Sequence, residues 1–95
     1  MIEVLKQHIK KFDYNFDYKI NNTYVFKNEN EISELQIFKV TMDYELERIM
    51  MWLEVDLGSF QEASEYSFDD AFIDILNGIK YWISKESRDE FKKGI

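Results

Sequence analysis

The chain has 95 residues, of which 45% are hydrophobic and 17% aromatic, and its formal net charge is −7 at pH 7. These values indicate one folded domain and exclude the disordered class, while the absence of cysteine excludes disulfides and thiolate chemistry. No apolar run approaches the ~20 residues that span a bilayer, and the first residues lack the apolar core of a signal peptide, so we expect a cytoplasmic protein without a membrane partner.

Two amphipathic segments begin the chain. Residues 2–12 have the apolar spacing of a helix, and His8 lies near the edge of its apolar side. From Tyr14 to Ile20 the period changes to two, which predicts a strand with one solvated face. A return strand follows over residues 23–27.

The turn between these strands leaves two registers open. A two-residue turn at Asn21-Asn22 suits a type I′ hairpin, and it places Val25 rather than Tyr24 on the face of Tyr18. A three-residue loop buries Tyr24 and Phe26 instead. We prefer the longer loop, because two buried aromatics outweigh a turn preference.

The middle of the chain predicts a long hairpin. Residues 28–34 form a polar connection, and residues 33–42 and 45–57 are two strands of a hairpin that bends near Asp43-Tyr44. A helix over residues 43–53 is the competing interpretation, because no glycine or proline interrupts this part. Residues 60–66 are expected to form a loop or a short helical turn.

The strongest single pattern is a helix over residues 67–84. Ser67 is expected to cap it, with Asp70 three residues later in the position of a capping box. A last short helix is expected over residues 87–93. The apolar residues of the main helix fall in one arc on a helical wheel: Phe68, Ala71, Phe72, Ile75, Leu76, Ile79, Trp82 and Ile83.

These elements predict an α+β fold: a single domain, residues 1–95, with an antiparallel sheet of about four strands flanked by an N-terminal and a C-terminal helix. With both helices on one face, the core is formed by Phe72, Ile75, Ile79 and Trp82 packed on Ile49, Met51, Leu53 and Val55.

The last two strands are apolar on both sides, so the opposite face of the sheet offers a patch for a homodimer or a partner. The alternative is that the helices cover opposite faces, or that residues 43–53 are helical. The residues of this patch are Leu35, Ile37, Met50 and Trp52.

Residues for catalysis are scarce. His8 is the only histidine, and no glycine-rich phosphate loop or EF-hand spacing occurs. Asp70 and Asp74 would share a helical face, but a solvated acidic face explains them better than a metal site. We therefore expect no enzyme, no metal and no cofactor.

The charge is concentrated in the middle of the chain. Residues 29–74 carry thirteen acidic and two basic side chains, a net −11, whereas both flanking segments are at +2. Such a surface repels nucleic acid and favours a basic protein partner, and aromatic residues within it supply contact area. We expect partner contacts from Trp52, Glu54, Asp56, Glu62, Glu65, Tyr66, Asp69, Asp70 and Asp74.

In length, acidity and helix–sheet–helix order, the chain resembles the class of small phage-encoded inhibitors, such as anti-CRISPR proteins and uracil-DNA glycosylase inhibitors. The resemblance implies an inhibitor that occludes the basic nucleic-acid-binding surface of a target protein or nuclease. Two alternatives stay open: an immunity protein that neutralises a toxin nuclease, and a self-associating structural or accessory protein.

Overall fold

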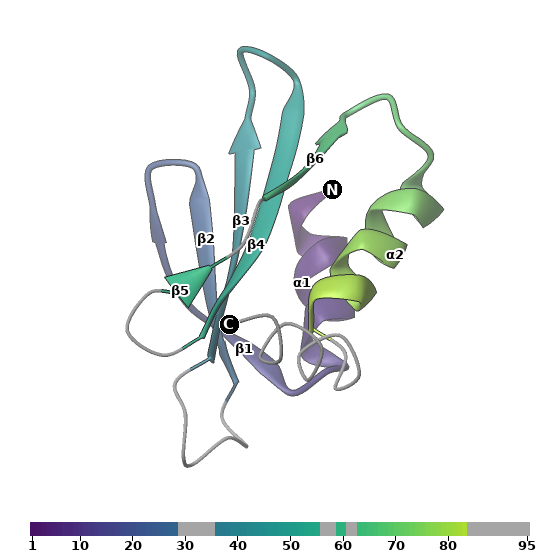
Figure 1. Ribbon diagram of the computed structural model, residues 1–95. Helices are drawn as coiled ribbons and strands as arrows, with labels where there is room; N and C mark the ends of the chain where they lie inside the picture. The colour runs from purple at the N-terminus through teal and green to yellow at the C-terminus, as the bar shows by residue number, and fades with distance from the viewer. Residues whose placement is uncertain (29–35, 56–58, 61–62, 84–95) are drawn as a thin grey trace.

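Two helices and one antiparallel sheet form an α+β fold, as the sequence predicts (Figure 1). The structure, a computed structural model, describes residues 1–28, 36–55, 59–60 and 63–83. The expected helix at 87–93 and the connection at 29–34 lie outside these residues. The elements are α1 (Ile2–Lys10), β1 (Tyr14–Ile20), β2 (Thr23–Asn28), β3 (Gln36–Asp43), β4 (Arg48–Val55), β5 (Ser59–Phe60), β6 (Ser64–Ser67) and α2 (Phe72–Ile83).

The sheet is a meander in the order β1-β2-β3-β4-β5, with antiparallel pairing throughout. The predicted hairpin of β3 and β4 is confirmed, and the competing helix over 43–53 is wrong. The bend is stabilised by Asp43, whose Oδ1 accepts hydrogen bonds from the backbone amides of Glu45 and Leu46 at 3.1 and 3.0 Å. Glu47 completes the turn with a φ of 53°.

The far edge of the sheet differs from the expectation of a loop over residues 60–66. β5 pairs with the end of β4, at Glu54 and Val55, and β6 pairs with its beginning, from Arg48 to Met51. The edge of β4 explains this pairing: its backbone N–H and C=O groups need hydrogen-bond partners, and even a polar segment can supply them. No periodicity in so short a stretch could reveal it.

The β1–β2 connection is the two-residue turn, so the longer loop that we prefer from the sequence is wrong. Ile20 pairs with Thr23, and Asn21 has the positive φ of 53° that such a turn requires. Tyr24 and Phe26 are nevertheless buried, as expected. A bulge between Phe16 and Tyr18 changes the register, so Phe26 pairs with Phe16 and not with Asp17.

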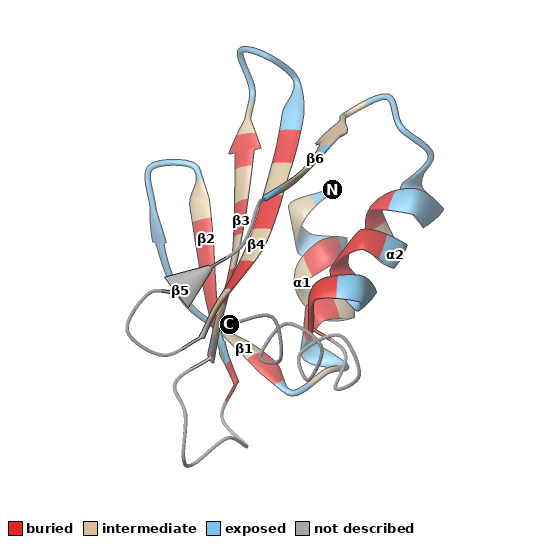
Figure 2. Cartoon of the chain, in the orientation of Figure 1, coloured by how far each residue is buried: buried red, intermediate tan, exposed pale blue. Residues whose placement is uncertain are grey.

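Both helices cover the same face of the sheet, as predicted (Figures 1 and 2). The core lies between the two layers, where the buried residues of α1, Leu5 and Ile9, meet those of α2 and of the central strands. Ile75, Ile79 and Trp82 are buried as predicted, and so are their expected partners Ile49, Met51 and Leu53. The side chain of Val55 lies outside the described residues.

The second helix begins at Phe72, five residues later than predicted. One half of the expected capping box forms, but it closes a turn before the helix: the Ser67 amide donates to Asp70 Oδ2 at 2.8 Å. Ser67 Oγ accepts from the Asp69 amide at 3.1 Å and not from the amide of Asp70. The prediction that Phe72 belongs to the core is therefore wrong: Phe72 is the first residue of α2 and is 39% exposed.

Candidate functional site

Two segments that are distant in the sequence meet at one end of the molecule: the β3–β4 turn and the segment from β6 to the first turn of α2 (Figure 1). We call this surface the acidic end. Arg48 is the one basic residue in the two segments, residues 43–48 and 64–74, against seven acidic ones, so their net charge is −6. The acidic residues are Asp43, Glu45, Glu47, Glu65, Asp69, Asp70 and Asp74.

Backbone and aromatic contacts hold the two segments together. The Phe68 amide donates a hydrogen bond to the Glu47 carbonyl at 2.9 Å, and the rings of Tyr44 and Phe68 meet edge to face with 5.8 Å between centroids. Each segment is also fixed internally, by Asp43 in the first and by Asp70 in the second. The acidic end is thus built on two tight turns that are joined by a backbone hydrogen bond and a ring contact.

Apolar side chains are exposed at the same end. Leu46 is 70% exposed, Ile73 60% and Tyr44 55%. Scattered exposed apolar residues are normal, but here they alternate with carboxylates on adjoining turns. This combination of apolar area and negative charge suits recognition of a protein surface rich in Lys and Arg.

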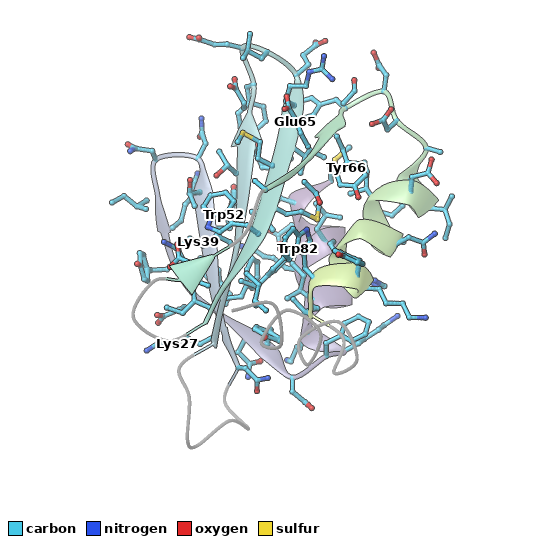
Figure 3. The ribbon with its side chains drawn as sticks, viewed as in Figure 1. Lys27, Lys39, Trp52, Glu65, Tyr66 and Trp82 are labelled. Atoms are coloured by element: carbon cyan, nitrogen blue, oxygen red, sulfur yellow. The ribbon has the colours of Figure 1, made fainter. Side chains whose placement is uncertain are left out.

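Four of the nine predicted site residues belong to this end. Glu65, labelled in Figure 3, makes an exposed ion pair with Arg48, with 3.7 Å between Oε1 and Nε. Asp69, Asp70 and Asp74 are exposed. Asp70 precedes α2, so the regular helical spacing between Asp70 and Asp74 that the sequence suggests does not exist. Asp56 and Glu62 lie outside the described residues.

Of the other three predicted residues, Trp52 and Glu54 lie outside the two segments, whereas Tyr66 lies within residues 64–74 but is half-buried. Glu54 is half-buried in the sheet, where its Oε1 contacts Lys39 Nζ at 3.0 Å and accepts a hydrogen bond from Trp52 Nε1 at 3.2 Å. Tyr66 projects from β6 toward α2 and packs against Gly78. Figure 3 shows Trp52 and Tyr66 apart from each other, at different strands of the sheet.

Sequence reasoning places Tyr44 at the bend of the hairpin and Leu46 in its second strand, and it includes neither in the site. The sequence signal for them is that these two apolar residues alternate with the acidic residues Asp43, Glu45 and Glu47. That pattern is visible in the sequence, but its proximity to the β6–α2 segment depends on the Phe68–Glu47 hydrogen bond.

His8 is separate from the acidic end. It lies on α1 beside Phe12, with the ring centroids 5.5 Å apart, and its Nε2 is buried without a hydrogen-bond partner. Burial lowers the pKa of His8 below 6.5, the charge of Lys11 lowers it further, and the backbone of Leu76 acts in the opposite sense.

Within the part of the chain that the structure describes, no three His, Asp or Glu side chains group closely enough to hold a metal ion. Neither described helix has the length and apolarity needed to cross a membrane. The chain matches no protein-family model, no curated protein and no solved structure.

Proposed function

We propose that this protein is a binding protein, not an enzyme, and that it inhibits a target by occluding the target's basic nucleic-acid-binding surface. The observation that carries this proposal is the acidic end, where two turns combine a net charge of −6 with exposed Tyr44 and Leu46. Negative charge steers a basic partner toward this surface, and the exposed side chains supply buried area once contact is made.

The rigid turns support this role. Asp43 and Asp70 each use a carboxylate oxygen to fix their own turn, which leaves Glu45, Asp69 and Asp74 to face solvent. Charges held on fixed backbone lose little entropy on binding, so more of their interaction with a partner appears as affinity. Nucleic acid, which carries the same sign of charge, is a competitor for the target and not itself a ligand.

The biological setting that fits is that of the small phage-encoded inhibitors which the chain resembles in length, charge and element order. In that setting the target is a cytoplasmic nuclease or another nucleic-acid-binding protein. An immunity protein acts on a toxin nuclease by the same physics, and the target's identity separates the two.

The experiment is a capture from the heparin-binding fraction of a bacterial lysate, with three baits. These are the wild type, Glu45→Lys/Asp69→Lys, and a control with the same charge change, Glu3→Lys/Asp17→Lys, at sites remote from the acidic end. Glu3 and Asp17 make only weak, exposed ion pairs, so their reversal leaves the fold intact.

We expect the wild type and the control to capture the same protein, and the acidic-end variant to lose it. The captured protein, once purified, should lose its nucleic-acid binding when the wild-type chain is added. Equal capture by all three baits, or a captured protein that still binds nucleic acid, would contradict the proposal.

A further inference from the structure

The β3–β4 turn alternates apolar and acidic side chains, and both kinds face solvent. Tyr44 is 55% and Leu46 70% exposed, and Glu45 and Glu47, the acidic residues that alternate with them, are exposed as well. The turn is fixed from within, since the backbone amides of Glu45 and Leu46 both donate to Asp43 Oδ1. One short, fixed stretch of backbone therefore presents apolar groups next to negative charges.

The ring of Tyr44 is held in place although it is exposed. It meets the ring of Phe68 edge to face, with 5.8 Å between the centroids, and the Phe68 amide donates to the Glu47 carbonyl at 2.9 Å. The ring therefore combines a fixed orientation with 55% exposure. A ring that is both oriented and accessible loses little conformational freedom when it packs against a partner.

Apolar groups beside the charges distinguish two classes of basic target. A protein that binds duplex DNA contacts mainly phosphates and the edges of stacked bases, so its surface is polar as well as positive. A protein that binds a single strand combines a positive groove with aromatic side chains on which the bases stack. Negative charge suits both classes. Exposed apolar side chains suit the second, because pressing them against Lys and Arg alone would desolvate these cations without a hydrogen bond in return.

We propose that the target surface is the groove of a protein that binds single-stranded nucleic acid. Glu45 and Glu47 take the place of phosphates there, and Tyr44 and Leu46 take the place of bases. This inference rests on the proposed function and adds to it the class of target. The charged part of the contact weakens as salt rises, whereas the apolar part does not, so the two parts can be measured separately.

The first experiment divides the possible targets before capture. A bacterial lysate is passed over duplex-DNA cellulose, the flow-through is passed over single-stranded-DNA cellulose, and the proteins eluted from each column are offered to the wild-type chain. We expect capture from the single-strand eluate alone, and the captured protein, once purified, should release a labelled single-stranded oligonucleotide when the wild-type chain is added. Capture from the duplex eluate would overturn this inference and leave the proposed function standing. Capture from neither eluate would overturn both.

The second experiment tests the contacting residues with the purified pair. Tyr44→Ala and Leu46→Ala remove the apolar groups but keep every charge, and Leu46→Ala retains the backbone amide that donates to Asp43. The matched control is Val4→Ala/Tyr81→Ala, which truncates an exposed aliphatic residue and an exposed tyrosine on the two helices. Circular dichroism establishes that each variant is folded.

We expect each turn variant to bind at least about tenfold more weakly than the wild type at every salt concentration, with an unchanged salt slope. The control should bind as the wild type does. Turn variants that bind as tightly as the wild type, or a loss that the control shares, would overturn this inference. Glu45→Lys/Asp69→Lys reports on the proposed function separately, because it changes the charge and leaves Tyr44 and Leu46 in place.

Discussion

The ring of Tyr66, on the edge strand β6, lies against the backbone of Gly78 in the middle of α2. A Cβ at position 78 would stand 2.7 Å from Tyr66 Cζ, closer than real Cβ atoms approach, so the absence of a side chain is what brings the helix down onto the edge of the sheet.

Gly78→Ala should lower the free energy of unfolding by about 1 kcal/mol. Displacing the Tyr66 ring costs about 1–3 kcal/mol, whereas alanine favours a helix over glycine by about 1 kcal/mol. In a Tyr66→Ala background only the helix preference remains, so there Gly78→Ala should stabilise the protein. Denaturant titrations of the four proteins measure both effects, and the same sign in both backgrounds would mean that the contact is not what excludes a side chain.

The two ends of α2 should respond differently to truncation. Ile79→Ala removes a fully buried side chain between the layers and should cost about 2–5 kcal/mol. Phe72→Ala, at the exposed first turn, should cost less than about 1 kcal/mol. Thermal or chemical denaturation compares them directly, and a larger loss for Phe72→Ala would place the start of the helix in the core after all.

Glu54 is expected to stabilise the sheet. Glu54→Ala leaves the half-buried Lys39 and Trp52 Nε1 without this partner, which should cost about 1–3 kcal/mol. The matched control is Glu65→Ala, whose ion pair with Arg48 is exposed and should be worth under about 1 kcal/mol. Equal losses in chemical denaturation would show that the Lys39–Glu54–Trp52 cluster is no stronger than a surface ion pair.

His8 should make stability depend on pH. Its pKa is lower in the folded protein than the unfolded value of 6.5, so the unfolded chain binds a proton more readily. Its contribution is present above pH 6.5 and is lost as the pH falls from there through the folded pKa. In His8→Gln, the free energy of unfolding measured between about pH 7 and 5 should change less steeply than in the wild type. An unchanged slope would assign the pH dependence to the carboxylates.

Much of this fold can be predicted from the spacing of the hydrophobic residues along the sequence. The 3.6-residue spacing in α1 and α2 and the alternation along β4 predict these elements and the shared face of the helices. What the period does not contain is the β1 bulge: an extra residue at Asp17 moves Tyr18 and Ile20 away from the core, and only the observed register reveals it.

The candidate site can also be predicted only in part, because some of its residues are brought together by contacts between distant segments. Charge excess along the chain identifies Asp69, Asp70 and Asp74, because charge is a property of the sequence alone. The contribution of Tyr44 and Glu45 depends on a contact between segments more than twenty residues apart, Phe68 to Glu47, which no local pattern encodes. The capping signal of Ser67 and Asp70 is real, yet it shapes a turn and not the helix end.

The most direct test of the acidic end is the salt dependence of its affinity for the captured target. For the wild type and for Glu3→Lys/Asp17→Lys, we expect affinity to fall steeply as salt rises, because charges at a rim steer encounter and are screened over ~8–10 Å. For Glu45→Lys/Asp69→Lys, we expect weak binding and a shallow slope, with a loss of several kcal/mol at low salt from like-charge contact. If the two variants bind equally and their slopes coincide, the acidic end is not the binding surface.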